Sequence, residues 1–149
     1  MRRILTIIIA LVTLAGVADA QISVKKSEFE KAKQVATLSM SWAWLYQQDG
    51  GYYLVMKSDN QFDDSFWLKI GETKEECLES LNSLLDLCGT IGEADRFDIG
   101  GGGETLDVTQ YKAMGAKGLR FHGKGRAGTG YILPAHLTKA VKWIEKNVS

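Results

Sequence analysis

The feature that most constrains the fold is a run of apolar residues, spaced three and four apart, between residues 73 and 89. Thr73 and Glu76 form a capping box in front of the run, and Gly89 follows it. The pattern predicts a helix over residues 74 to 88 with one apolar side, which must pack against another layer of structure. Its apolar positions are Cys77, Leu78, Leu81, Leu84, Leu85 and Cys88.

Two further helices are predicted, one at each end of the chain. Pro134 suits the first position of a helix over residues 134 to 147, because a helix leaves the N–H of that position unpaired. The apolar stripe of this helix consists of Leu137, Ala140, Val141, Ile144 and Val148. A capping box at residues 27 to 30 predicts a short N-terminal helix that continues to about residue 35.

Large residues alternate with small ones over residues 38 to 46, which predicts one strand with a single large apolar face. The large residues are Leu38, Met40, Trp42, Trp44 and Tyr46. Such a row is typical of a core, and stacking on sugar rings is the alternative for its aromatic members. A turn at residues 49 to 51 and a strand over residues 52 to 57 complete a hairpin.

The remaining strands are less regular. Residues 66 to 70, 118 to 122 and 130 to 133 are predicted strands, and residues 96 to 99 form a brief one within a glycine-rich loop. Residues 105 to 111 are ambiguous between strand and helix. The expected fold is α+β: an antiparallel sheet of about five or six strands, with the two main helices packed on one face, plus the short N-terminal helix.

A shift of 63 residues aligns the apolar positions of two strand–helix segments, placing Leu68 on Tyr131, Ile70 on Leu133 and Leu81 on Ile144. Two interpretations are open. The chain contains an internal repeat, or two amphipathic strand–helix units resemble each other because both are half buried.

The first twenty residues have the three parts of a secretory signal peptide. Arg2 and Arg3 precede an apolar stretch, which is followed by the small-x-small sequence of residues 18 to 20. The stretch is shorter than the roughly 20 residues needed to span a bilayer. We therefore expect cleavage after Ala20, a single domain over residues 21 to 149, and a soluble periplasmic or extracellular protein that is not embedded in a membrane.

The two cysteines, Cys77 and Cys88, are expected to be buried thiols. Eleven positions apart on one helix, their Cα atoms would be roughly 16 Å from each other. A disulfide requires less than about 7 Å, so no bond between them is predicted.

Charge is divided sharply along the chain. Residues 59 to 107 contain 13 acidic and 3 basic residues, whereas residues 108 to 144 contain 7 basic residues and no acidic one. Two solvated faces that attract each other within the fold would explain the division. The alternative is a basic surface over about residues 112 to 126 for an anionic macromolecule or protein partner. Its candidate residues are Lys117, Arg120, His122, Lys124 and Arg126.

No cofactor or metal site is predicted. The glycines at 100 to 103 lie between carboxylates and are interpreted as a flexible connection, since a phosphate would be repelled there. The glycines at 123, 125 and 128 have G-x-G-x-x-G spacing, but a strand rather than a helix is predicted after them. A calcium loop starting at Asp59 would need glutamate where Ile70 stands.

Three functional hypotheses follow. The first is a non-enzymatic binding module that uses the basic surface; aromatic residues for base stacking are sparse there, with only Phe121 nearby. The second is a small hydrolase that uses His122 or His136 with a carboxylate. The third is a self-associating structural protein in which the acidic and basic stretches pair between chains.

Overall fold

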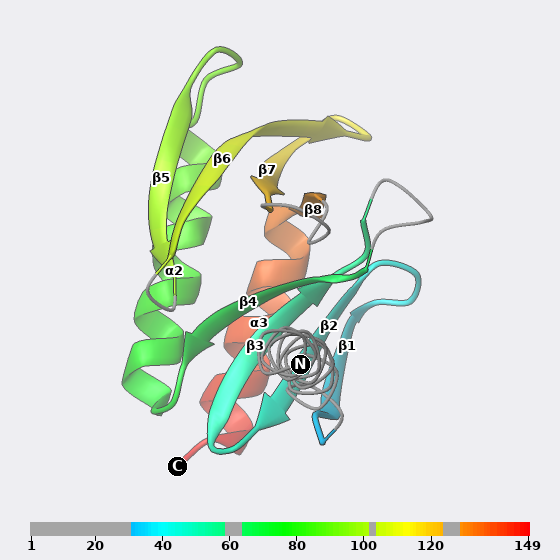
Figure 1. The fold of residues 1–149 in the computed structure, drawn as a ribbon, viewed down its shortest axis with the longest axis vertical. Helices are drawn as coiled ribbons and strands as arrows, with labels where there is room; N and C mark the ends of the chain where they lie inside the picture. Colours follow the sequence, from blue (N-terminus) through cyan, green and yellow to red (C-terminus); the bar gives the residue numbers. More distant parts are fainter. Residues whose placement is uncertain (1–30, 59–63, 102–103, 124–128) are drawn as a thin grey trace, which may run out of the picture. The chain divides into compact units, whose positions relative to one another are not determined.

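The computed structural model describes residues 31–58, 64–101, 104–123 and 129–149. The chain divides into two compact units, Met1–Ala32 and Lys33–Ser149, and the second contains every helix and strand described here (Figure 1). The expected signal peptide and the capping box at 27 to 30 lie outside the described residues. The elements of the second unit are β1 (Lys33–Ser39), β2 (Ala43–Gln48), β3 (Gly51–Met56), β4 (Phe66–Gly71), α2 (Lys74–Thr90), β5 (Arg96–Gly101), β6 (Glu104–Ala113), β7 (Ala116–His122), β8 (Thr129–Ile132) and α3 (Pro134–Asn147).

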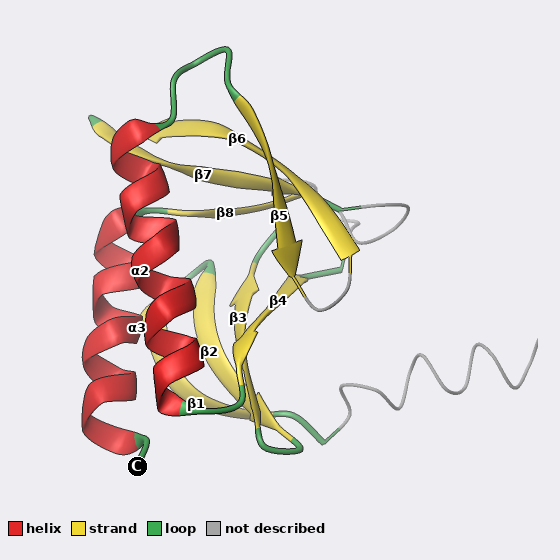
Figure 2. Ribbon diagram, turned by 90° about the vertical axis from the view of Figure 1, so that its left-hand side faces the viewer, coloured by secondary structure: helices red, strands yellow, loops and turns green. Residues whose placement is uncertain are grey.

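The strands form two antiparallel sheets with the orders β1-β2-β3-β4 and β5-β6-β7-β8. Both helices lie next to each other along the same side of the two sheets (Figure 2). The α+β class and the two main helices are therefore confirmed. The prediction of one sheet is wrong, because the chain has a complete second set of four strands.

The prediction of a flexible connection at residues 100 to 103 is wrong for its first two glycines, which belong to β5. Gly100 pairs with Thr105 and Gly101 with Glu104, so the segment expected to be a flexible connection carries strand pairing into the β5–β6 hairpin. Residues 105 to 111, which were ambiguous in the sequence, belong to β6.

A single hydrophobic core joins the two sheets and the helices. On the first sheet, Leu45, Leu54 and Leu68 lie opposite one another on neighbouring strands and are buried. The Phe66 and Phe121 rings, one from each sheet, stack with their centroids 5.8 Å apart. The helices contribute Cys77, Leu81, Leu84, Cys88, Leu137, Ala140 and Ile144.

The predicted strand over residues 38 to 46 is instead a hairpin. β1 ends at Ser39, which pairs with Ala43 at the start of β2, and Met40 in the intervening turn is 93% exposed. After the turn, Ala43 and Leu45 face the core, so strand alternation places Trp44 and Tyr46 on the opposite, outer face. The prediction that these two aromatic residues belong to the core is therefore wrong.

The predicted continuation of the N-terminal helix to residue 35 is also wrong. Lys33–Ser39 is a strand, in which Gln34 pairs with Tyr46 of β2. The Lys139 ammonium of α3 donates a hydrogen bond to the Leu38 carbonyl oxygen (3.1 Å). Strand pairing and helix packing thus decide a segment whose local signal favours a helix.

The two halves of the unit repeat one topology, four strands followed by a helix. Lys33 and Arg96, which begin the first strand of each half, are 63 positions apart. The helices, however, begin at Lys74 and Pro134, only 60 positions apart. A uniform shift of 63 also places buried Leu68 on Tyr131, which is half buried, so one offset does not describe the correspondence.

The helix α2 begins with the predicted capping box. Glu76 N donates to Thr73 Oγ1 (3.3 Å), and Thr73 N donates back to Glu76 Oε2 (3.3 Å). Hydrogen bonds from the backbone N–H groups of Glu72 and Thr73 lower the pKa of the Glu76 carboxyl. Within the described ranges, neither helix has the length and apolarity to cross a lipid bilayer.

Candidate functional site

The strand β7 carries three of the five predicted binding residues, and it divides them between its two faces. Leu119 and Phe121 point into the core, so Arg120 and His122 lie on the outer face of the second sheet. Lys117 alternates in phase with Leu119 and Phe121 and so lies on the inner face of the sheet. It is nevertheless exposed, because it stands at the start of β7 next to the β6–β7 turn. Lys124 and Arg126 lie outside the described residues.

Arg120 belongs to a stack of side chains on this outer face. Its Cζ atom lies 5.2 Å from the centroid of the Tyr111 ring, which is cation–π geometry. The Tyr111 ring in turn lies 4.6 Å from the Tyr131 ring, centroid to centroid, with 31° between the planes. Tyr111 and Tyr131 are half buried, so the stack is part of the surface.

The absence of a side chain on Gly118 explains how this stack forms. Tyr111 is on β6 and Tyr131 on β8, with β7 between them. The residue of β7 opposite Tyr111 is Gly118, so no side chain separates the two rings. A Cβ atom at this position would lie 2.2 Å from the Ile132 carbonyl oxygen.

The stack continues to the first sheet through the β1–β2 turn. Trp42 lies 5.9 Å from Tyr131 and 6.1 Å from the His136 ring, centroid to centroid. The indole N–H of Trp42 is buried and makes no hydrogen bond within the described part of the chain. We call Arg120, Tyr111, Tyr131 and Trp42 the aromatic–arginine row.

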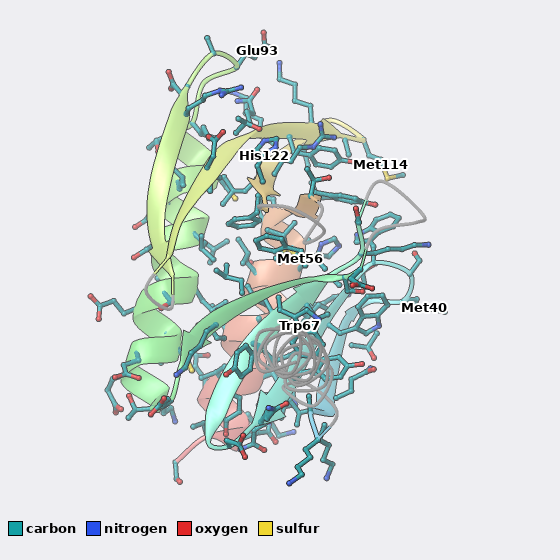
Figure 3. All side chains as sticks on the ribbon, in the orientation of Figure 1. Met40, Met56, Trp67, Glu93, Met114 and His122 are labelled. Atoms are coloured by element: carbon teal, nitrogen blue, oxygen red, sulfur yellow. The ribbon has the colours of Figure 1, made fainter. Side chains whose placement is uncertain are left out.

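His122 lies on the same face of β7 as Arg120, two positions along the strand. Its side chain is labelled in Figure 3. Its Nε2 atom is hydrogen bonded to Thr109 Oγ1 at 2.9 Å. In the strand register His122 is opposite Asp107, whose Oδ2 atom is 3.4 Å from Arg96 Nη1. Arg96 lies opposite Thr109 and shares this face. The described part of the outer face therefore mixes three basic side chains with hydroxyl and aromatic groups and the ion-paired carboxylate of Asp107.

The hairpin tip between β6 and β7 carries further basic residues. Lys112 and Lys117 lie opposite each other, and Lys112 forms an ion pair with Glu93. Of the ion pairs within the described ranges, this one joins the acidic stretch to the basic stretch. A pocket of about 280 Å³ lies at the tip, where Met114 is 95% exposed.

The outer face of the first sheet is aromatic as well. The Trp67 ring on β4 lies 5.0 Å from the Tyr46 ring and 6.2 Å from the Tyr53 ring, centroid to centroid. Trp44 and Trp67 lie on either side of Val55 in the strand register. This face carries no basic residue except Lys69 among its described positions on β2, β3 and β4.

The hydrolase hypothesis requires His122 or His136 to meet a carboxylate. Within the described ranges, neither His122 nor His136 hydrogen bonds to a carboxylate.

Burial raises the pKa of the Cys77 and Cys88 thiols to about 11, so they are protonated at neutral pH. Both are free and buried, as predicted. The described His, Cys, Asp and Glu residues contain no group of three that could hold a metal ion.

Sequence reasoning missed Tyr111 and Tyr131. Trp42, predicted to be a core residue, is partly buried and packs against the core as well as near Tyr131. The prediction that aromatic residues are sparse near the basic residues is wrong, because strands β6 and β8 bring two tyrosines to the face of Arg120. The sequence signal that could have indicated this face is the alternation of apolar and polar residues within residues 118 to 122. It assigns Arg120 to the outer face, and any aromatic residue on a neighbouring strand can then share that face.

Comparison with known proteins gives no match: no protein-family model, no curated protein and no solved structure is significantly similar to this chain.

Proposed function

We propose that this protein is an exported, non-enzymatic binding module that holds an anionic partner on the outer face of the β5–β8 sheet. The observation that carries the proposal is that Arg120 and His122 share that face next to the stacked rings of Tyr111 and Tyr131. Export rests on the signal-peptide pattern of residues 1 to 20.

The surrounding charge supports an anionic rather than a cationic partner. The stretch from residue 108 to 144 has no acidic residue, so β7 and β8 bring no carboxylate to the outer face, and β7 adds the positive charge of Arg120. The one carboxylate among the described outer-face neighbours of His122, Asp107, is paired with Arg96. An approaching anion is therefore attracted to this side of the sheet.

The experiment compares three variants that each remove one positive charge. Arg120→Gln acts on the proposed face, Lys117→Gln at the hairpin tip, and Lys142→Gln on an exposed position of α3 in the same acid-free stretch. Each protein is applied to a sulfated-polysaccharide resin and eluted with a salt gradient. We expect Arg120→Gln to elute at clearly lower salt than Lys142→Gln, although their net charges are identical.

The two other variants define the alternatives. Equal shifts for all three would mean that the resin senses net charge alone, and the proposal would be wrong. A larger shift for Lys117→Gln than for Arg120→Gln would move the binding surface to the hairpin tip and would also contradict it. Circular dichroism of each variant verifies that the fold is retained.

A further inference from the structure

We infer that the anionic partner is an acidic polysaccharide, whose sugar rings stack on Tyr111 and Tyr131 while its carboxylates meet Arg120 and His122. This inference rests on the proposed function and adds the chemical class of the ligand. It is carried by the juxtaposition of rings and basic groups in the aromatic–arginine row, together with the charge pattern of the outer face.

The arrangement of the row suits a chain of rings that carry separated charges. Tyr111, Arg120 and Tyr131 come from three neighbouring strands, which in a sheet are about 4.8 Å apart. The row crosses the strands and continues to Trp42, so a linear ligand laid along it would meet the half-buried aromatic side chains in succession. Arg120 provides the positive charge beside these rings, and the His122 ring, two positions away on β7, adds a hydrogen-bonding group.

The polar groups beside the row are those that recognise hydroxyl-rich ligands. Thr109 and Thr129 lie opposite Arg120 and His122 in the strand register, and both are half buried. Hydroxyl side chains both donate and accept hydrogen bonds, as sugar hydroxyls do. The face thus combines stacking, hydrogen-bonding and positive groups within a few residues.

The charge density of the face favours an acidic sugar over single-stranded nucleic acid. A nucleic acid carries a phosphate at every nucleotide and is usually bound in a continuous positive groove. Here Asp107 lies directly opposite His122, with 38% of its side chain exposed, and Thr109 lies opposite Arg120. Three basic residues, of which Arg96 is paired with Asp107, stand among neutral groups, and this arrangement matches a ligand that carries fewer charges per unit length.

The test uses three probes of similar length: a hyaluronan oligosaccharide, which carries a carboxylate on every second sugar, a neutral N-acetylglucosamine oligosaccharide, and single-stranded DNA. Binding is followed by tryptophan fluorescence, since Trp42 contacts Tyr131 at one end of the row. We expect the acidic oligosaccharide to bind at least about tenfold more tightly than either other probe at low salt, and to weaken as salt is added.

Two pairs of variants test the stacking. Tyr111→Leu should weaken binding of the acidic oligosaccharide about tenfold, the effect of one lost stacking contact, whereas Tyr111→Phe keeps the ring and should bind as the parent protein does. Trp67→Leu removes an aromatic residue from the outer face of the other sheet and should have no effect. Tyr111→Phe retains the packing of the ring, so it tests the inference even if Tyr111→Leu fails to fold. Loss of binding in both variants would show that the ring does not hold the ligand by stacking.

The outcomes separate this inference from the proposed function. Tighter binding of DNA than of the acidic oligosaccharide, equal binding of the neutral one, or unchanged binding by Tyr111→Leu would each overturn the ligand class. The proposed function would still stand if Arg120→Gln weakens retention on the sulfated resin. If Arg120→Gln has no specific effect on the resin, both the function and the ligand class are wrong.

Discussion

His136 shows how one residue couples the pH to the stability of the fold. It is 8% exposed in the first turn of α3, where the Leu133 N–H donates a hydrogen bond to its Nδ1 atom (3.4 Å). Only the neutral ring can accept this bond. Burial, and to a lesser extent the positive charge of Lys139, lowers the pKa of His136 below its ordinary value of 6.5.

We therefore expect acid to destabilise the protein through His136. Below about pH 6.5 the unfolded chain binds a proton at this residue that the folded chain does not, so the free energy of unfolding falls. Above that pH the free energy of unfolding keeps its full value. Once the pH falls below the lowered pKa of His136, the free energy of unfolding stops decreasing. The slope between is at most about 1.4 kcal/mol per pH unit. Urea unfolding between pH 5 and pH 7.5 measures it.

The matched variants are His136→Gln, which should flatten the decline between pH 6.5 and pH 5, and His122→Gln, which leaves His136 in place and should keep it. The same slope in the parent protein and in His136→Gln would show that other groups cause the acid sensitivity.

At the scale of elements, the helices were predictable because their signals are local. The capping box of α2, its apolar stripe and Pro134 of α3 lie within the helices they define. The β1–β2 hairpin was not predictable, because the period-two pattern of residues 38 to 46 continues through a turn of three residues. The position of Tyr131 beside Tyr111 depends on the register of three strands, which no single segment encodes.

Among the glycines that the structure describes with their surroundings, Gly118 of β7 has the least room for a side chain. We expect Gly118→Ala to lower the free energy of unfolding by about 1–3 kcal/mol. The new Cβ would lie 2.2 Å from the Ile132 carbonyl oxygen, and the backbone must shift to relieve this contact. Gly89→Ala is the control: it lies in α2 with nothing near its Cβ, and should raise stability by about 0.5–1 kcal/mol. Similar urea midpoints for the two variants would contradict the close approach of β7 and β8.

At the scale of the whole molecule, the two halves of the unit Lys33–Ser149 share one hydrophobic core, so we expect them to unfold together. The core contains residues of both sheets and both helices, and the Phe66–Phe121 contact joins the sheets directly. Ser58 and Gly130 form a further backbone bridge between the halves. Sequence reasoning gave the class and the helices. It divided the strands wrongly, because the pairing of Gly100 and Gly101 is decided by partners across the sheet.

The cysteines report on this cooperativity. We expect Cys77 and Cys88 to react slowly with iodoacetamide at pH 8, because both are buried and their pKa of about 11 leaves almost no thiolate. In unfolding concentrations of urea both should react together, and intact-mass spectrometry counts the adducts. Rapid modification of one thiol in the native protein would indicate that α2 opens separately from the rest.

The stack of Arg120 on Tyr111 has a consequence for conformational entropy. A free arginine side chain loses roughly 2 kcal/mol of rotamer freedom when a ligand fixes it. Arg120 is half buried and already lies over a tyrosine ring, which itself lies against a second one. Much of that loss has therefore occurred on folding, so a ligand that contacts Arg120 retains more of its interaction energy as affinity than it would from an exposed lysine such as Lys117.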